Sequence, residues 1–178
     1  TKMLNLIEER NGQTIDLENL ANHKGSVFGS QGQKQPSQKL FETLIYDRFK
    51  NLKTSEPIFV EAESNKIGNL HIPKEFWKLM KSSPQIELSA TVEQRAKFLV
   101  EEYSEITTDL DLLEKQITSL SNIAGHKVVE SWLRMAKNKE FIELAKQLIE
   151  KHYDPRYKPG LLRKKKEVFA TLKIDDIS

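Results

Sequence analysis

The chain has 178 residues, 28 basic and 26 acidic side chains and a formal net charge of +2. Its hydrophobic content of 38% with 30% charged residues is typical of a folded globular protein and argues against an intrinsically disordered one. The absence of cysteine excludes disulfides and a thiol nucleophile, and no apolar run reaches the roughly 20 residues that span a bilayer, so we expect a cytoplasmic protein without a membrane partner.

Helices and strands are predicted to alternate over the first half of the chain. The helices follow from apolar residues at spacings of three and four, and the strands from short apolar runs bounded by turn residues. In chain order we expect a helix at 1–10 that stops at Asn11-Gly12, a strand at 13–20, a helix at 36–52, a strand at 56–64 buried on both faces, a helix at 72–80, a strand at 85–90 and a helix at 91–106. This alternation predicts an α/β fold, with a parallel sheet flanked by helices.

The second half is predicted to be mostly helical. Apolar residues recur at helical spacing from about Ala96 to Tyr153, and the stretch YDPRYKPG then ends the helical pattern. The segment KEVFATLKI (166–174) alternates apolar and polar residues, which predicts a last strand. We therefore expect an α/β part at 1–95, a helical subdomain at 96–157, and a basic segment with the returning strand at 158–178.

Positive charge is concentrated near the C-terminal end of the sequence. Residues 151–178 carry 8 basic and 4 acidic side chains, whereas residues 1–150 carry 20 and 22. The stretch RYKPGLLRKKK (156–166) suits contact with phosphates, although a solvated tail remains the alternative. In HYDPRYKPG (152–160), tyrosines beside cations are typical of single-stranded RNA binding, whereas a turn with packed tyrosines would explain them structurally.

The loop ANHKGSVFG (21–29) is a candidate anion site. Gly25 and Gly29 allow backbone amides to approach a ligand, Lys24 supplies a positive charge, and His23 and Ser26 supply hydrogen-bond donors. An ordinary surface loop with a helix cap is the alternative.

Two further candidates follow predicted strands. Glu61 and Glu63 come at the end of an apolar strand and share one face of it, so their carboxylates can hold a metal-bound water or act as a base. Arg95, which follows the third strand, can clamp a phosphate or a carboxylate with its two-pronged guanidinium. A structural acid and a salt bridge are the respective alternatives.

Four motifs, taken in order, resemble the tRNA 2-selenouridine synthase family. They are DLENLANHKGSVFG (16–29), QPSQKLFETL (35–44), VEAESNKIGNLHIP (60–73) and YDPRYK (153–158), and the resemblance covers essentially the whole chain. It implies a rhodanese-like module joined to a P-loop module and a helical segment. The implied reaction converts 2-thiouridine at the wobble position of tRNA to 2-selenouridine, with selenophosphate and geranyl diphosphate as co-substrates and S-geranyl-2-thiouridine as the intermediate.

The sequence departs from that family pattern in its N-terminal part. It lacks the rhodanese module with its cysteine and the glycine-rich phosphate loop, and Thr1 resembles the hydroxyl residue that closes that loop. We therefore expect a C-terminal fragment with a partial P-loop-type parallel sheet. A first strand missing from the middle of that sheet would leave unpaired edges, so we expect the fragment to be inactive alone and to need the N-terminal half as a partner.

The resemblance also implies roles for individual residues. The implied sites are catalytic (His23, Glu61, Glu63), diphosphate-binding (Thr1, Lys24, Gly25, Ser26, Gly29, Arg95), tRNA-binding (Gln35, Ser37, Tyr153, Arg156, Tyr157, Lys164, Lys165, Lys166) and, for an optional Mg²⁺ ion, Thr1 and Glu61. Two alternatives remain open. One is a nucleoside or nucleotide kinase-like phosphotransferase, for which the chain lacks the P-loop lysine. The other is a non-catalytic RNA-binding remnant.

Overall fold

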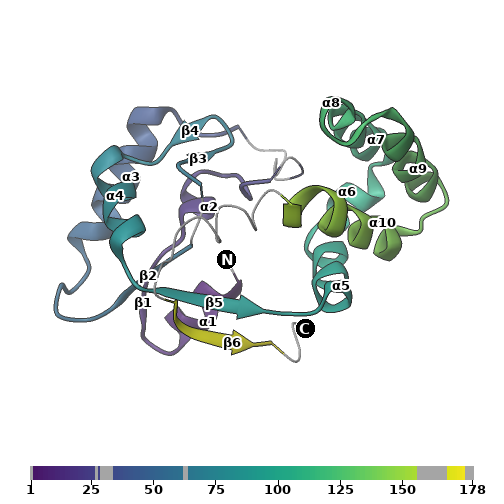
Figure 1. Ribbon diagram of the computed structural model, residues 1–178. Helices are drawn as coiled ribbons and strands as arrows, with labels where there is room; N and C mark the ends of the chain where they lie inside the picture. The colour runs from purple at the N-terminus through teal and green to yellow at the C-terminus, as the bar shows by residue number, and fades with distance from the viewer. Residues whose placement is uncertain (1, 27, 29–33, 62–63, 156–167, 175–178) are drawn as a thin grey trace. The chain divides into compact units, whose positions relative to one another are not determined.

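The computed structural model describes residues 2–26, 28, 34–61, 64–155 and 168–174 (Figure 1). The chain divides into two compact units, residues 1–83 and residues 84–178. The domains predicted from the sequence, with boundaries after residues 95 and 157, stay a prediction. In the described part of the chain, every helix is too short or too polar to cross a membrane.

The first unit combines helices with short strands. Its elements are α1 (Lys2–Glu9), β1 (Gln13–Ile15), α2 (Leu17–Leu20), α3 (Gln38–Lys50), β2 (Ile58–Val60), β3 (Lys66–Ile67), β4 (Leu70–His71) and α4 (Lys74–Ser82). The predicted stop of the first helix is confirmed, because Asn11 takes a positive φ of 61° and the Gly12 N–H donates to the Ile7 carbonyl at 2.8 Å.

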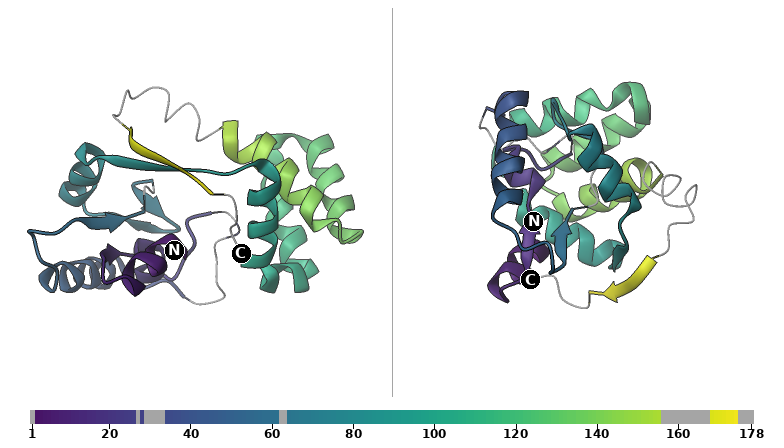
Figure 2. Two further views of the ribbon diagram at one scale, coloured as in Figure 1. Left: turned by 90° about the horizontal axis from the view of Figure 1, so that it is seen from below. Right: turned by 90° about the vertical axis from the view of Figure 1, so that its left-hand side faces the viewer.

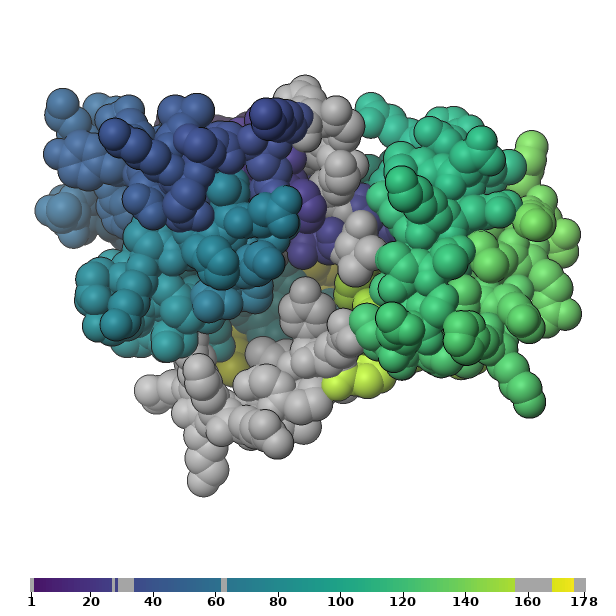
Figure 3. Space-filling model, turned by 90° about the horizontal axis from the view of Figure 1, so that it is seen from above, coloured from purple at the N-terminus to yellow at the C-terminus, as the bar shows by residue number. Residues whose placement is uncertain are grey.

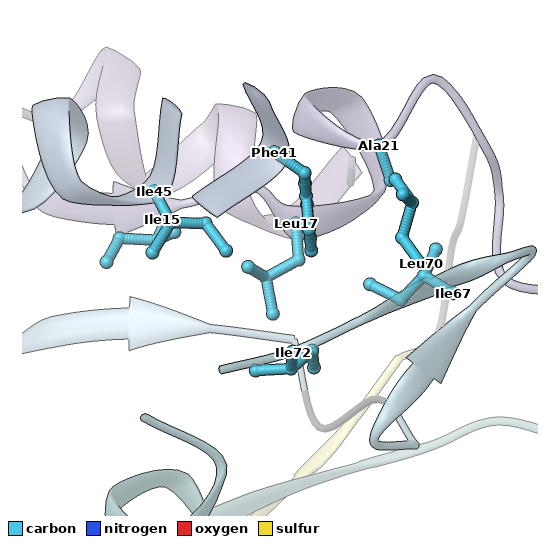
Figure 4. Packing of buried hydrophobic residues seen from close by; sticks show 8 residues of the cluster. All are labelled: Ile15, Leu17, Ala21, Phe41, Ile45, Ile67, Leu70 and Ile72. Carbon is cyan, nitrogen blue, oxygen red and sulfur yellow. The ribbon is translucent and has the colours of Figure 1, made fainter. Parts of the chain in front are cut away.

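An apolar core in the first unit joins β1 and α2 to α3 and the β3–β4 hairpin. Figure 4 shows its buried side chains, which come from β1, α2, α3 and the segment that includes the hairpin: Ile15, Leu17, Ala21, Phe41, Ile45, Ile67, Leu70 and Ile72. Burial of these side chains fixes α3 against β1 and against β4. The strand ends and the loop after α2 are therefore attached to a packed core.

The predicted strand at 13–20 is wrong in its second half. The strand ends at Ile15, and Asp16 then caps α2 by accepting a hydrogen bond from the Asn19 N–H at 2.8 Å. An aspartate at this position satisfies one of the free N–H groups of a helix start, which favours a helical turn over a longer strand. As a result the loop from Ala21 onward follows a short helix, whereas the sequence placed it after a strand.

The second unit carries most of the helices. Its elements are β5 (Gln85–Ser89), α5 (Val92–Glu102), α6 (Ser104–Thr108), α7 (Leu110–Ser119), α8 (Ser121–Ala124), α9 (His126–Lys137), α10 (Phe141–Leu148), the π-helix η1 (Ile149–Tyr153) and β6 (Val168–Lys173). The predicted third and last strands are confirmed as β5 and β6, which pair in parallel and run side by side in Figures 1 and 2.

The helices of the second unit pack on one another through buried side chains. α10 packs on α5 and α9, and α7 packs on α9. The residues most deeply buried between them include Ile117, Leu120, Trp132, Ala136 and Ile149. Figure 3 shows the green helices of this unit as a closely packed group.

The sheets are shorter than the sequence predicted. β1 pairs with β2 in parallel, β3 with β4 antiparallel, and β5 with β6 in parallel, each as a two-stranded sheet. The prediction that the strand around Phe59 is buried on both faces is wrong, since all three residues of β2 are only partly buried. The α/β class with parallel pairing is confirmed, and a P-loop-type arrangement stays a prediction.

Candidate functional site at the strand ends

Two acidic residues follow the paired strands β1 and β2 at the same step of their register. Ile15 lies opposite Val60, so the next residues along the two strands are Asp16 and Glu61. Because parallel strands end at the same edge of their sheet, both carboxyl groups lie at the edge where open α/β sheets bind ligands.

The Glu61 carboxyl group is held by the chain that leaves β1. Its Oε2 atom accepts a hydrogen bond from the Leu17 N–H at 3.0 Å. Its Oε1 atom is buried and has no hydrogen-bond partner among the described residues. One oxygen of this side chain is therefore fixed, and the other remains available to a ligand or a proton.

The surroundings of Glu61 favour the protonated form of its side chain. Burial, followed by the proximity of the Asp16 carboxyl group, raises the pKa of Glu61 from 4.5 to about 8, although the Leu17 N–H acts in the opposite direction. At neutral pH the side chain is then mostly a neutral carboxylic acid. Such a group can donate a hydrogen bond or a proton, which an ionised glutamate cannot do.

The loop after α2 is shaped by a tight turn at Gly25. Gly25 has a φ of 68°, and the Ser26 N–H donates to the Lys24 carbonyl at 2.8 Å. The Gly25 N–H donates to Nδ1 of His23 at 3.0 Å. A glycine suits this position because a positive φ strains residues that carry a Cβ atom.

That hydrogen bond also defines the state of the histidine. An Nδ1 atom that accepts a hydrogen bond carries no proton, so the imidazole is neutral with its proton on Nε2. Burial lowers the pKa of His23, which favours the same neutral form. His23 therefore offers an Nε2–H donor, and Lys24 next to it contributes a positive charge.

Gln35 and Ser37 use their polar groups within the fold. Nε2 of Gln35 donates to the carbonyls of Ala21 (3.2 Å) and Ile67 (3.1 Å), and its Oε1 accepts from the Asn69 N–H at 2.7 Å. Gln35 thus ties the loop after α2 to the β3–β4 hairpin. Ser37 caps α3 by accepting from the Leu40 N–H at 3.2 Å. Their contact with tRNA stays a prediction.

Arg95 in the second unit is engaged by a carboxylate. Its guanidinium donates two hydrogen bonds to Asp154, at 3.1 and 2.7 Å, which joins α5 to the end of η1. The salt bridge that the sequence left open is therefore present, and the phosphate-binding role of Arg95 stays a prediction. Tyr153 packs edge to face against His152, with 5.0 Å between ring centroids.

The remaining predicted site residues lie outside the described part of the chain. They are Thr1, Gly29, Glu63, Arg156, Tyr157, Lys164, Lys165 and Lys166.

Asp16 belongs to this site but is absent from the residues predicted from the sequence. Its signal was an acid that directly follows an apolar strand, the same signal that identified Glu61. Because the sequence predicted a strand over 13–20, Asp16 was placed inside that strand and not at its end. The structure ends the strand at Ile15.

The described residues do not by themselves make a magnesium site. They contain no group of three or more histidine, aspartate or glutamate side chains that could hold a metal ion. Asp16 and Glu61 provide two carboxyl groups, and one oxygen of Glu61 already accepts the Leu17 N–H. A hard cation such as Mg²⁺ prefers several charged or neutral oxygen ligands. Thr1, the other residue predicted to hold Mg²⁺, lies outside the described residues, so the Mg²⁺ ion stays a prediction.

Comparison with known proteins gives one consistent family. The family model described as "tRNA 2-selenouridine synthase AAA domain" matches residues 1–135. Proteins named tRNA 2-selenouridine synthase are similar over 68% of the chain in Cupriavidus pinatubonensis (35% identity), 88% in Alcanivorax borkumensis (27%) and 88% in Shewanella sediminis (30%). The matched parts are 32%, 51% and 50% of those relatives, so the chain spans about a third to a half of their length. No solved structure matches the chain.

Proposed function

Because this chain belongs to the tRNA 2-selenouridine synthase family, we propose that it supplies the tRNA- and diphosphate-binding part of such an enzyme. The proposed reaction converts 2-thiouridine at the wobble position to 2-selenouridine through S-geranyl-2-thiouridine. The observation that carries this proposal is the family match, which spans residues 1–135 and so includes both strand ends and the loop after α2.

The proposed role of the loop is to stabilise a leaving diphosphate. In the geranyl transfer, a bond forms from the sulfur of 2-thiouridine to the geranyl carbon as the bond from that carbon to diphosphate breaks. Negative charge then develops on the diphosphate, and positioned donors and cations stabilise such charge most effectively. The Nε2–H of His23 and the ammonium group of Lys24 are donors of that kind on one short loop.

Glu61 is proposed to act in the same step as a positioned acid. Its buried Oε1 atom has no hydrogen-bond partner among the described residues, and its pKa of about 8 keeps it largely protonated near neutral pH. It can therefore donate a hydrogen bond or a proton to an anionic oxygen at the strand ends. In the second step, selenium from selenophosphate replaces the geranylated sulfur, which leaves as geranyl thiol while phosphate is released after the selenium–phosphorus bond is hydrolysed. No described residue is assigned to that step.

The β5–β6 pair leaves apolar side chains without full cover. Parallel strands are normally covered on both faces, but Ile86, Leu88, Phe169 and Leu172 are 43%, 46%, 75% and 46% exposed, so other residues of this chain or further polypeptide must cover them. The relatives contain about as much chain again, or more, outside the matched part. We propose that this additional N-terminal part, with its rhodanese and P-loop segments, completes the enzyme, with the cytoplasm as its expected location.

Nucleoside analysis of tRNA tests the proposal. A tRNA that carries 2-thiouridine is incubated with the chain, geranyl diphosphate and selenophosphate, with and without the N-terminal part of the Alcanivorax borkumensis relative, and the digested nucleosides are measured by mass spectrometry. We expect tRNA binding but no product from the chain alone, and S-geranyl-2-thiouridine or 2-selenouridine when the N-terminal part is present.

Three other outcomes distinguish the alternatives. Binding without product in both reactions would favour the non-catalytic RNA-binding remnant. Transfer of phosphate from ATP to a nucleotide by the chain would favour the kinase-like phosphotransferase. Absence of tRNA binding at low salt would contradict the proposed function itself.

A further inference from the structure

The outer face of α9 carries several exposed positive charges. Lys127, Arg134 and Lys137 are exposed, and no described residue forms an ion pair with any of them. Glu130 lies one turn before Arg134 on this face, and it too forms no ion pair with a described residue. The opposite side of the helix is anchored in the core of the second unit by Val129, Trp132 and Ala136.

Helix stability does not account for this charge pattern. Cations stabilise a helix in its last turn and destabilise it in its first turn, because of the helix dipole. Arg134 and Lys137 lie near the end of α9 and fit this rule, but Lys127 lies in the first turn, which has no acidic residue and no side-chain cap. A lysine in the first turn slightly destabilises the helix, so the helix dipole does not explain the positive charge at this position.

Charge is also segregated among the helices of this unit. Residues 126–139 contain four basic side chains and one acidic side chain, whereas residues 92–119 contain three basic and seven acidic ones. By contrast, two cations of α4 in the first unit have partners, since Lys78 pairs with Glu75 at 2.8 Å and Lys81 lies over the ring of Trp77. The basic face of α9 is therefore a distinct feature of the described residues.

A hollow lies beside these cations. It has a volume of about 360 Å³, and Glu130, Leu133, Arg134 and Lys137 line it. Its lining combines one apolar side chain, two positive charges and one negative charge. An open depression of this kind can receive part of a ligand that also contacts the face around it.

From the exposed cations, the unfavourable position of Lys127 and the adjacent hollow, we infer that the outer face of α9 binds the phosphate backbone of RNA. This inference rests on the proposed function, since it assigns a contact surface for tRNA. Arg134 lies between Lys127 and Lys137, which are ten residues apart on the helix, or about 15 Å along the axis. Duplex nucleic acid presents about one phosphate per 3.4 Å of each strand, so three cations over this span can each meet a phosphate.

The surface consists of other residues than the basic segment at 156–166, which the sequence identified. Contacts with phosphates release counterions, so binding weakens with salt by a slope of roughly 0.7–0.9 per contact on a double-logarithmic plot. The triple variant Lys127→Gln/Arg134→Gln/Lys137→Gln removes three such contacts. The slope of log affinity against log salt concentration should therefore be less steep by about 2 in this variant.

The test compares this variant with a matched control. The control Lys97→Gln/Lys115→Gln/Lys173→Gln also removes three exposed positive charges from the second unit, from α5, α7 and β6. Affinity for an unmodified tRNA transcript is measured by fluorescence anisotropy at several salt concentrations, with the full 178-residue chain. Circular dichroism checks that both variants fold like the parent.

We expect at least a tenfold loss of affinity at low salt for the α9 variant and less than a threefold loss for the control. Equal losses, or an unchanged salt slope in the α9 variant, would overturn the inference while leaving the proposed function intact. If the parent chain binds no tRNA at low salt, both the inference and the proposed function are wrong.

Discussion

Glu61 and Leu17 connect the ends of two parallel strands, because the Leu17 N–H donates to Oε2 of Glu61 at 3.0 Å. Leu17 follows β1 by two residues and is fully buried, so the donor is rigidly placed. This contact fixes the Glu61 side chain beside Asp16, where burial and a neighbouring carboxyl group favour its protonated form.

The first prediction concerns the pH dependence of stability. The pKa of Glu61 is about 8 in the folded chain against 4.5 as the reference, so the unfolded state loses this proton at lower pH than the folded state. The stabilisation is therefore complete below about pH 4.5 and is lost as pH rises towards 8. Each pKa unit corresponds to about 1.4 kcal/mol, so the total is a few kcal/mol.

Replacement of the acid by an amide tests this dependence. Glu61→Gln keeps an acceptor for the Leu17 N–H and cannot ionise, so we expect a variant that matches the parent near pH 4 and is more stable than the parent at pH 8. Urea unfolding across this range measures the difference, with Glu9→Gln at the exposed end of α1 as the control. Parallel stability curves for the parent and Glu61→Gln would show that Glu61 is not buried as a neutral acid.

The second prediction separates the two roles of Asp16. Asp16→Asn keeps an oxygen that can cap α2 and removes the charge, so the pKa of Glu61 should fall but stay above 4.5 because burial is the largest cause of its shift. Asp16→Ala should also cost about 1 kcal/mol of stability through the lost cap. Carbon-detected NMR of the glutamate carboxyl groups measures the pKa directly. If the pKa of Glu61 is unchanged in Asp16→Asn, the charge of Asp16 does not contribute to the raised pKa.

The third prediction concerns the salt bridge between Arg95 and Asp154. The two side chains are 37% and 17% exposed, so water weakens the pair, and we expect Arg95→Ala and Asp154→Ala each to cost about 1 kcal/mol. The double variant should cost less than the sum of the two, as expected for contacting residues.

Phosphate binding by Arg95 predicts a different response to the loss of its partner. If Arg95 also binds phosphate, Asp154→Asn frees the guanidinium and raises the affinity for inorganic diphosphate. If Arg95 is structural, the affinity stays unchanged while stability falls. Isothermal titration of inorganic diphosphate into Asp154→Asn and into the parent distinguishes the two outcomes.

The fourth prediction concerns Gln35 and the hairpin turn that it contacts. Gln35→Ala removes three hydrogen bonds to backbone groups, so we expect a loss of about 1–3 kcal/mol. Gly68→Ala should be similarly harmful, because Gly68 has a φ of 58° and an added Cβ would lie 2.3 Å from Oε1 of Gln35. Thermal unfolding measures both. A Gln35→Ala variant as stable as the parent but weaker in tRNA binding would instead support the tRNA role.

The sequence predicted the larger elements because their apolar periodicity is sustained over many residues. The helix at α3, the helix at α5 that begins after Thr91, and the strands β5 and β6 follow from local patterns alone. Glu61 was found because an acid at the end of an apolar strand is itself a local signal.

The parts that failed are two short elements and one contact between distant residues. The α2 turn replaced a predicted strand because the Asp16 cap outweighed the apolar alternation. The β3–β4 hairpin was missed because its strands have two residues each, although Gly68-Asn69 is a turn signal. Asp16, Glu61 and the Leu17 N–H lie together because β1 pairs with β2. This pairing joins residues about 45 positions apart, so no local sequence pattern predicts it.

Binding of inorganic diphosphate, followed by NMR of the ¹⁵N-labelled chain, tests the central claim most directly. The strand ends and the loop after α2 are proposed to bind a diphosphate. The NMR signals of the backbone amides of Leu17, Gly25 and Ser26 should therefore shift, and their shifts should saturate at the same diphosphate concentration. Lys24→Gln should weaken this binding several-fold, and sulfate should give smaller shifts. Saturable shifts confined to other parts of the chain, or none at millimolar diphosphate, would contradict a diphosphate site at the ends of β1 and β2.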